Sequence, residues 1–87
     1  MNELDASIFE KKIMEVYHNT EKRLKNGMVT LSTCELWQRG FYCSDKLEAQ
    51  SIPYVANLFS HNGFTVKHSV NHGVEDYNIY PKIQINF

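Results

Sequence analysis

The apolar residues of this 87-residue chain follow two different periods, and the change between them limits the fold more than any other sequence feature. In the first third they recur every three to five residues, the spacing of one helix face. These residues are Leu4, Ile8, Ile13, Val16, Tyr17 and Leu24. In the last quarter one face alternates with polar residues, as in a strand with one buried side. Its residues are Phe64, Val66, His68 and Val70, then Tyr77, Ile79, Ile83, Ile85 and Phe87. The chain is therefore predicted to be an α+β protein in which two main helices pack on a small antiparallel sheet of two or three strands.

A capping box predicts the start of the first helix. Ser7 and Glu10 have the S-x-x-E spacing, in which each side chain accepts a hydrogen bond from the other residue's amide. The helix is predicted to extend over about 19 residues and to end at Gly27 as a left-handed C′ residue. The only basic cluster, Lys22-Arg23-Leu24-Lys25, is interpreted as a solvated helix end that balances the helix dipole.

The segment after Gly27 has two interpretations. Met28–Ser32 is short and partly β-branched, which predicts a brief strand. Thr33–Arg39 then forms a short helix that ends at Gly40, or the strand continues to Trp37. Periodicity does not separate these two alternatives.

A second helix is predicted from Ser44, its N-cap, to Asn62-Gly63. Its apolar residues are Leu47, Val55, Leu58 and Phe59. Pro53 lies inside this segment, where proline removes a hydrogen bond and clashes with the preceding turn. We therefore expect a break or bend near Gln50–Pro53, with Ser51 as the N-cap of a separate helix.

The two alternating runs near the C-terminus predict an antiparallel hairpin whose connection spans residues 71–76. Pro81 cannot donate a ladder hydrogen bond, so its strand is predicted to be an edge strand or bulged there. The predicted order is thus helix, strand, an optional short helix, helix, strand, strand.

Length and composition predict one domain over residues 1–87. The net charge of −1 favours neither nucleic acid nor an acidic membrane as a partner. An acidic N-terminal segment and the lack of a long apolar run argue against a signal peptide and a membrane span. Only two cysteines are present, which favours a reducing compartment, and we expect a cytoplasmic protein.

The residues with metal-binding or nucleophilic chemistry do not have the spacing that such sites require. Five candidate ligands fall within 39 residues, but the cysteines are too far apart for a zinc knuckle. These candidates are Cys34, Cys43, His61, His68 and His72. The sequence has no phosphate-binding glycine loop, H-E-x-x-H or G-x-S-x-G motif. We therefore expect no metal, no cofactor and no enzymatic activity, with both cysteines as small buried apolar residues.

The element order resembles that of a winged helix-turn-helix protein. Four segments carry this resemblance: Val29-Thr30-Leu31, Cys34-Glu35-Leu36-Trp37, Val55-Ala56-Asn57-Leu58-Phe59 and Asn62-Gly63-Phe64-Thr65-Val66. The resemblance implies a transcriptional regulator whose third helix enters the major groove of DNA. That helix would present Asp45, Lys46, Glu48, Gln50, Ser51 and Asn57, and the wing would present Glu75 and Asp76. Four acidic residues against one lysine would repel phosphates, so DNA binding is the alternative function.

Eleven aromatic residues (one Trp, five Tyr and five Phe) are more than the core of a chain of this length needs. Those outside the apolar stripes are candidates for a protein-binding or homodimer surface: Trp37, Phe41, Tyr42, Tyr54 and Tyr80. The other interpretation is that they cover irregular parts of the core. The favoured function is a small non-enzymatic protein-binding module. In type it resembles the accessory and inhibitor proteins of bacteriophages and mobile elements, although it shares no motif with them.

Overall fold

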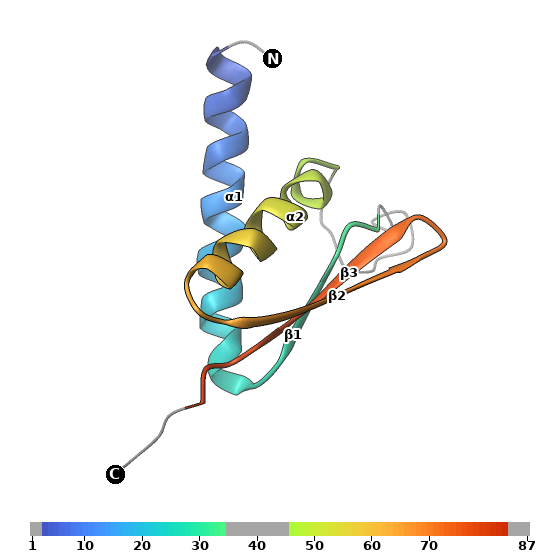
Figure 1. Cartoon of the computed structure of the whole chain (residues 1–87). Coiled ribbons are helices and arrows are strands. Elements are labelled where there is room, and N and C mark those ends of the chain that lie inside the picture. Colours follow the sequence, from blue (N-terminus) through green and yellow to red (C-terminus); the bar gives the residue numbers. More distant parts are fainter. Residues whose placement is uncertain (1–2, 35–45, 84–87) are drawn as a thin grey trace.

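A computed structural model describes residues 3–34 and 46–83 (Figure 1). Helix α1 (Glu3–Arg23) is followed by a 3-10 turn, η1 (Leu24–Asn26), and by strand β1 (Val29–Ser32). Helix α2 (Lys46–His61) then leads into strands β2 (Thr65–Asn71) and β3 (Val74–Tyr80). The prediction of an α+β fold with two main helices and a C-terminal hairpin is confirmed.

The three strands form an antiparallel sheet in the order β1-β3-β2. The optional third strand is therefore present, and the last strand of the chain is the central one. Val29 and Val66 pair with Ile79 from either side, so residues with apolar side chains meet across the sheet. The connection between β2 and β3 is shorter than predicted, because His72 and Gly73 both have positive φ and close a two-residue turn.

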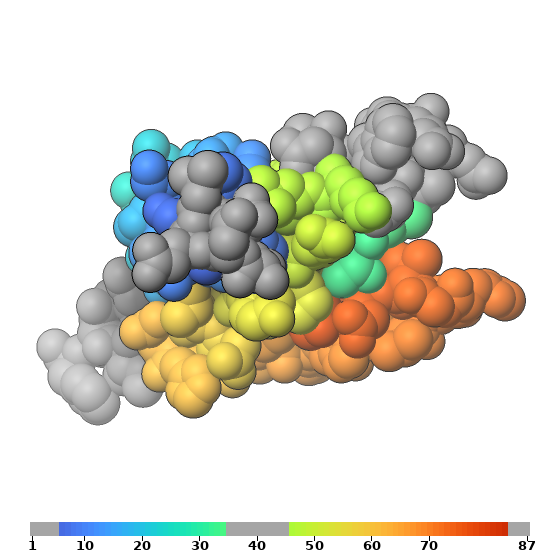
Figure 2. Space-filling view, turned by 90° about the horizontal axis from the view of Figure 1, so that it is seen from above, coloured from blue at the N-terminus to red at the C-terminus, as the bar shows by residue number. Residues whose placement is uncertain are grey.

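Both helices lie on one face of this sheet. Helix α2 contacts all three strands, and α1 packs along α2. Figure 2 shows the two helices side by side, while the hairpin of β2 and β3 extends beyond them. The buried core contains Val16, Tyr17, Leu24, Val29, Leu31, Ala49, Ile52, Val55, Phe59 and Ile79. Val16, Tyr17 and Leu24 of the predicted helical stripe thus meet Ile79 of the predicted alternating face in one core. Two other predicted members, Ile8 of the stripe and Val70 of the alternating face, are exposed instead, at 46% and 61%.

The predicted start of the first helix is wrong. Ser7 lies inside α1, which already includes Glu3, so Ser7 is not its N-cap. At the other end Gly27 has a positive φ of 127°, as predicted, and its amide donates to the carbonyl of Leu24 at 3.2 Å. With a ψ of −166°, Gly27 lies in an extended backbone region that essentially only glycine adopts, rather than in the left-handed helical region.

Of the break or bend predicted near Gln50–Pro53, the break is wrong, because α2 continues through Pro53. Ser51 caps nothing: its hydroxyl is fully buried and donates to the carbonyl of Glu48 at 2.6 Å. The buried residues of α2 lie on both sides of Pro53, and their packing outweighs the hydrogen bond that proline removes. The predicted end at Asn62-Gly63 is confirmed, since Phe64 donates its amide to the carbonyl of Phe59 at 3.0 Å, one bond of a Schellman cap.

The prediction that Pro81 lies within a strand is wrong. Strand β3 ends at Tyr80, and Pro81 follows it. Because β3 is central and needs donors toward both neighbours, it cannot include a proline. The alternation predicts that Ile83 lies on the buried face, but it is 90% exposed. Ile85 and Phe87 lie outside the described residues, as does the segment 35–45 on which the helix-or-strand alternative depends.

Candidate binding surfaces

The two described tyrosines among the predicted partner-binding residues lie on different surfaces. Tyr54 lies on α2 and is 57% exposed. Tyr80 is half-buried on β3 and follows Ile79, which is fully buried beneath the helices, so Tyr80 lies on the opposite sheet face. The other three predicted residues, Trp37, Phe41 and Tyr42, are outside the described residues. The structure therefore replaces one expected surface by two.

The first surface lies between the two helices. The ring of Phe9 on α1 meets the ring of Tyr54 edge-on, with centroids 5.2 Å apart and an interplanar angle of 89°. Ile8, next to Phe9, is 46% exposed. The N-terminal end of α1 extends beyond α2, as Figure 1 shows. We call Ile8, Phe9 and Tyr54 the helical aromatic surface.

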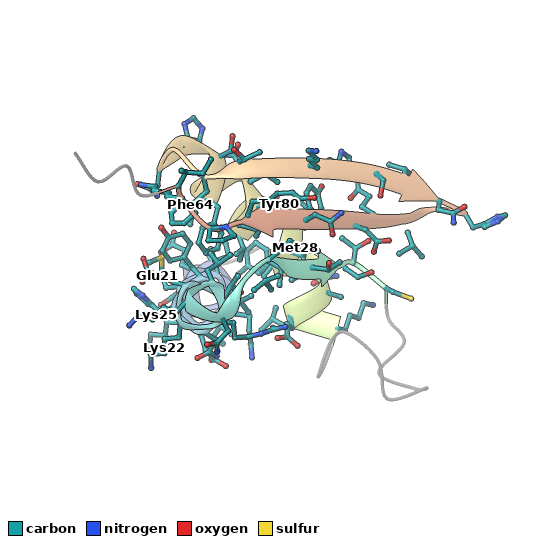
Figure 3. All side chains as sticks on the ribbon, turned by 90° about the horizontal axis from the view of Figure 1, so that it is seen from below. Glu21, Lys22, Lys25, Met28, Phe64 and Tyr80 are labelled. Carbon is teal, nitrogen blue, oxygen red and sulfur yellow. The ribbon has the colours of Figure 1, made fainter. Side chains whose placement is uncertain are left out.

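The second surface lies at the opposite end of α1, where the hairpin strands begin and end (Figure 3). The ammonium of Lys82 lies 4.6 Å from the ring centroid of Phe64. The ammonium of Lys67 lies 5.4 Å from that of Tyr80. Lys25, from the turn after α1, lines a hollow together with Phe64 and Lys82. We call these five residues the cationic end.

Two adjoining hollows give the cationic end its shape. One has a volume of about 590 Å³ and is lined by Gly63, Thr65, Lys67, Tyr80, Pro81, Lys82 and Ile83. The other has a volume of about 500 Å³ and is lined by Glu21, Leu24, Lys25, Phe64, Pro81 and Lys82. They share Pro81 and Lys82. The described lining residues of the two hollows include three lysines (Lys25, Lys67 and Lys82) and one acidic residue, Glu21, so the lining carries a positive net charge.

Sequence reasoning missed this cluster because its lysines are far apart in the chain. Lys25 belongs to the only basic run, whereas Lys67 and Lys82 are isolated charges in the hairpin region. The hairpin register was the available signal. Antiparallel pairing places Thr65 opposite Tyr80, so Lys67 lies on the same face, one pair further along β2.

A third group of polar side chains lies where the hairpin meets α2. The imidazole of His68 stacks on the ring of Tyr77, with centroids 4.4 Å apart and an interplanar angle of 5°. Its Nε2 lies 3.3 Å from a carboxylate oxygen of Glu75. His68 and Tyr77 border a shallow groove of about 290 Å³, whose other lining residues are Pro53, Ala56, Asn57, Ser60 and Val66.

Partial burial raises the pKa of the Tyr77 phenol above its ordinary value, and the carboxylate of Glu75 raises this pKa further, both by its charge and as a hydrogen-bond acceptor. The folded chain then holds this proton more tightly than the unfolded chain, whose tyrosine pKa is about 10. Its contribution to stability is present below pH 10 and is lost as the pH rises through the folded pKa.

We therefore expect Tyr77→Phe to weaken the dependence of unfolding free energy on pH above about pH 10. The difference in phenolate absorbance between the wild type and Tyr77→Phe isolates the titration of this tyrosine. Glu75→Gln is expected to move that titration to lower pH. If Tyr77 titrates at or below the ordinary tyrosine pKa in the wild type, the raised pKa is contradicted.

The described residues offer little for metal binding or nucleophilic chemistry. Within residues 3–34 and 46–83, no three His, Cys, Asp or Glu side chains are grouped as a metal site would require. Cys34 is buried, as predicted, whereas Cys43 lies outside the described residues. The predictions of no metal, no cofactor and no enzymatic activity stay predictions.

The surface that α2 presents differs from the one expected for DNA recognition. Lys46, Gln50 and Asn57 are exposed, as a recognition helix would require. Ser51, however, is fully buried, and Glu48 is half-buried. The exposed face of α2 therefore carries fewer acidic groups than the sequence indicates, but Lys46 is its only exposed lysine or arginine among the described residues.

Comparison with known proteins gives no match: no family model, no curated protein and no solved structure is significantly similar to the chain. In the described parts of the chain, neither helix has the combination of length and apolarity that crossing a membrane requires.

Proposed function

We propose that this protein is a small non-enzymatic module that binds a protein partner through the helical aromatic surface. The observation that carries this proposal is the exposure of Tyr54, at 57%, together with its edge-on contact with Phe9. A large ring that is already held on one side loses little conformational entropy when a partner covers the other side. Such rings are frequent anchors of protein interfaces.

The neighbouring residues support a protein partner. Ile8, which precedes Phe9 in α1, is 46% exposed and adds apolar surface on this helix. Apolar and aromatic side chains at the centre of a patch, with charged groups around them, are typical of protein interfaces. Glu10 and Lys11 are exposed on the next residues of α1 and supply this polar rim. The partner is either a second copy of this chain or, as in bacteriophage accessory proteins, a host protein.

We expect Tyr54→Ala to weaken partner binding about tenfold or more while leaving the fold intact. Proteins retained by the immobilised wild type are identified by mass spectrometry, and the dissociation constant is then measured for the purified partner. Sedimentation velocity of the wild type and of Tyr54→Ala tests whether the partner is a second copy.

A matched pair of variants provides the control. Ile8 is 46% exposed beside Phe9, whereas Met28 is 49% exposed just before β1, after the opposite end of α1. Ile8→Ala is expected to weaken binding and Met28→Ala to leave it unchanged. Unchanged binding in folded Tyr54→Ala and Ile8→Ala variants would contradict the proposal.

Duplex DNA binding is the second candidate, and two features favour it. The strand order β1-β3-β2 leaves a hairpin that extends beyond α2, like a wing (Figure 2). The exposed face of α2 carries Gln50 and Asn57, whose amides suit base edges. Lys67 and Lys82 lie at the base of the hairpin rather than near its tip at His72-Gly73, so they do not flank α2 as phosphate contacts would. For this reason protein binding is preferred.

Sequence-specific duplex binding that is lost in a Gln50→Ala, Asn57→Ala double variant would reverse this preference.

A further inference from the structure

The face of the sheet that the helices leave uncovered is polar, with one aromatic ring on its central strand. Thr30, Lys67 and Asn78 lie side by side across the three strands, and Tyr80 follows Asn78 on this face of β3. The hydroxyl of Thr30 lies 2.7 Å from the amide oxygen of Asn78 and donates a hydrogen bond to it. This face therefore offers a ring, an amide and an ammonium group within a few residues of one another.

The positive charge of the molecule is concentrated at the edge of the same face. Lys67 lies over Tyr80, and Lys82 lies over Phe64 between the two hollows. Lys25 lines the second hollow, where Glu21 is the one acidic residue among the described lining residues. Lys22, in the last turn of α1, adds exposed positive charge near Lys25 (Figure 3). Arg23, the next residue of this turn, is also exposed. The chain as a whole has a net charge of −1, so this concentration of charge is local.

We propose that this surface binds a single strand of nucleic acid, with a base stacked on Tyr80 and the phosphates along Lys67, Lys82 and Lys25. Stacking on an aromatic residue of an open sheet, with lysines along the backbone path, is how proteins hold single strands without a dedicated pocket. The two hollows adjoin at Pro81 and Lys82, which gives a continuous path for several nucleotides. The amide of Asn78 is placed to contact a base edge.

The other anionic partners fit less well. A peptide of Asp and Glu residues would use the lysines but has no aromatic ring to stack on Tyr80. Duplex DNA keeps its bases stacked inside the helix, so it cannot place one on a sheet. This proposal uses a different surface from the helical aromatic surface, so each proposal can fail without the other.

The test measures binding of a fluorescent oligothymidylate of about twelve nucleotides to the full chain by anisotropy. If the three lysines neutralise three phosphates, the logarithm of the association constant is expected to fall with the logarithm of the salt concentration with a slope of about −2. The double variant Lys67→Gln, Lys82→Gln is expected to reduce that slope to about −0.7, because one contact remains. The matched double variant Lys11→Gln, Lys46→Gln removes two exposed lysines elsewhere and is expected to leave the slope unchanged.

Changes at Tyr80 separate stacking from charge. Tyr80→Leu is expected to weaken binding about tenfold at each salt concentration without changing the slope, whereas Tyr80→Phe keeps the ring and binds like the wild type. Circular dichroism establishes that each variant is folded, and Tyr80→Phe keeps the test valid if Tyr80→Leu does not fold.

Three outcomes would overturn the proposal. The first is no binding at low salt. The second is an equal loss of oligothymidylate binding in the two lysine double variants. The third is tighter binding of either oligoglutamate or a duplex of the same sequence.

Discussion

Phe59→Ala is expected to lower the free energy of unfolding by about 3–5 kcal/mol. Phe59 is fully buried, stacks on Tyr17 with ring centroids 4.2 Å apart, and meets Phe64 edge-on at 5.1 Å. Truncating a buried phenylalanine reduces the free energy of unfolding by about 3–5 kcal/mol. A domain of this length has about 4–13 kcal/mol in total, so the loss is a large fraction of its stability.

Urea denaturation followed by circular dichroism measures this loss. Ile83→Ala is the control, because Ile83 is 90% exposed and its truncation is expected to change the midpoint little. Phe59→Leu keeps most of the apolar volume and is expected to lie between the wild type and Phe59→Ala. A Phe59→Ala midpoint close to that of Ile83→Ala would show that Phe59 does not hold α1, α2 and the start of β2 together.

Pro53→Ala is expected to stabilise the protein by about 2 kcal/mol. Proline in a helix interior is about 3 kcal/mol less favourable than alanine, because it lacks the amide hydrogen and its ring clashes with the carbonyl one turn earlier. Part of this gain is offset, by about 0.4–1 kcal/mol, because proline also restricts the unfolded chain. Pro53 is half-buried and borders the groove beside His68, so alanine removes only limited packing.

For a domain of this length, that gain corresponds to a rise in melting temperature of roughly 8–16 °C. Asn57→Ala, one turn further along the same groove, is the control for changes in the groove alone. A lower melting temperature for Pro53→Ala would contradict this account and would mean that the proline ring contributes more by packing than it costs the helix.

The periodic parts of the fold could be predicted from the sequence, and the irregular parts could not. Val16, Tyr17 and Leu24 are buried because a helical stripe must face a core, and Ile79 is buried because it lies on the inner face of an alternating run. The continuity of α2 could not be predicted, because a local rule for Pro53 competes with the burial of residues on both sides of it. At Pro53, tertiary packing of the buried residues of α2 outweighs the local preference of proline to interrupt a helix.

The alternation of Ile79 and Ile83 was misleading for a related reason. A period of two identifies a strand but does not say which strand is central. Once β3 pairs on both sides, Pro81 must end it, and Ile83 no longer belongs to the buried face. The order of strands in a sheet depends on contacts between distant segments, which no local pattern records.

The candidate surfaces were partly predictable. Tyr54 was selected because it lies outside the apolar stripe of its helix, and it is indeed exposed. Its contact with Phe9 depends on how α1 and α2 cross, and the cationic end depends on residues that are distant in sequence. Lys25, Lys67 and Lys82 become neighbours of the same pair of hollows only after the hairpin has paired and packed at the end of α1.

The position of β3 in the sheet also determines when the chain can fold during its synthesis. Among the described strands, β1 pairs with β3 alone, and their side chains meet across 48 residues, as between Thr30 and Asn78. Residues up to Tyr80 must therefore leave the ribosome before the sheet can form. Until then, the apolar faces of α1 and α2 have no sheet to cover them. Closing so long a loop is slow compared with helix formation. The side chains of Val55 and Phe59, which are fully buried in the folded protein, therefore reach their final packing only after β3 has been synthesised.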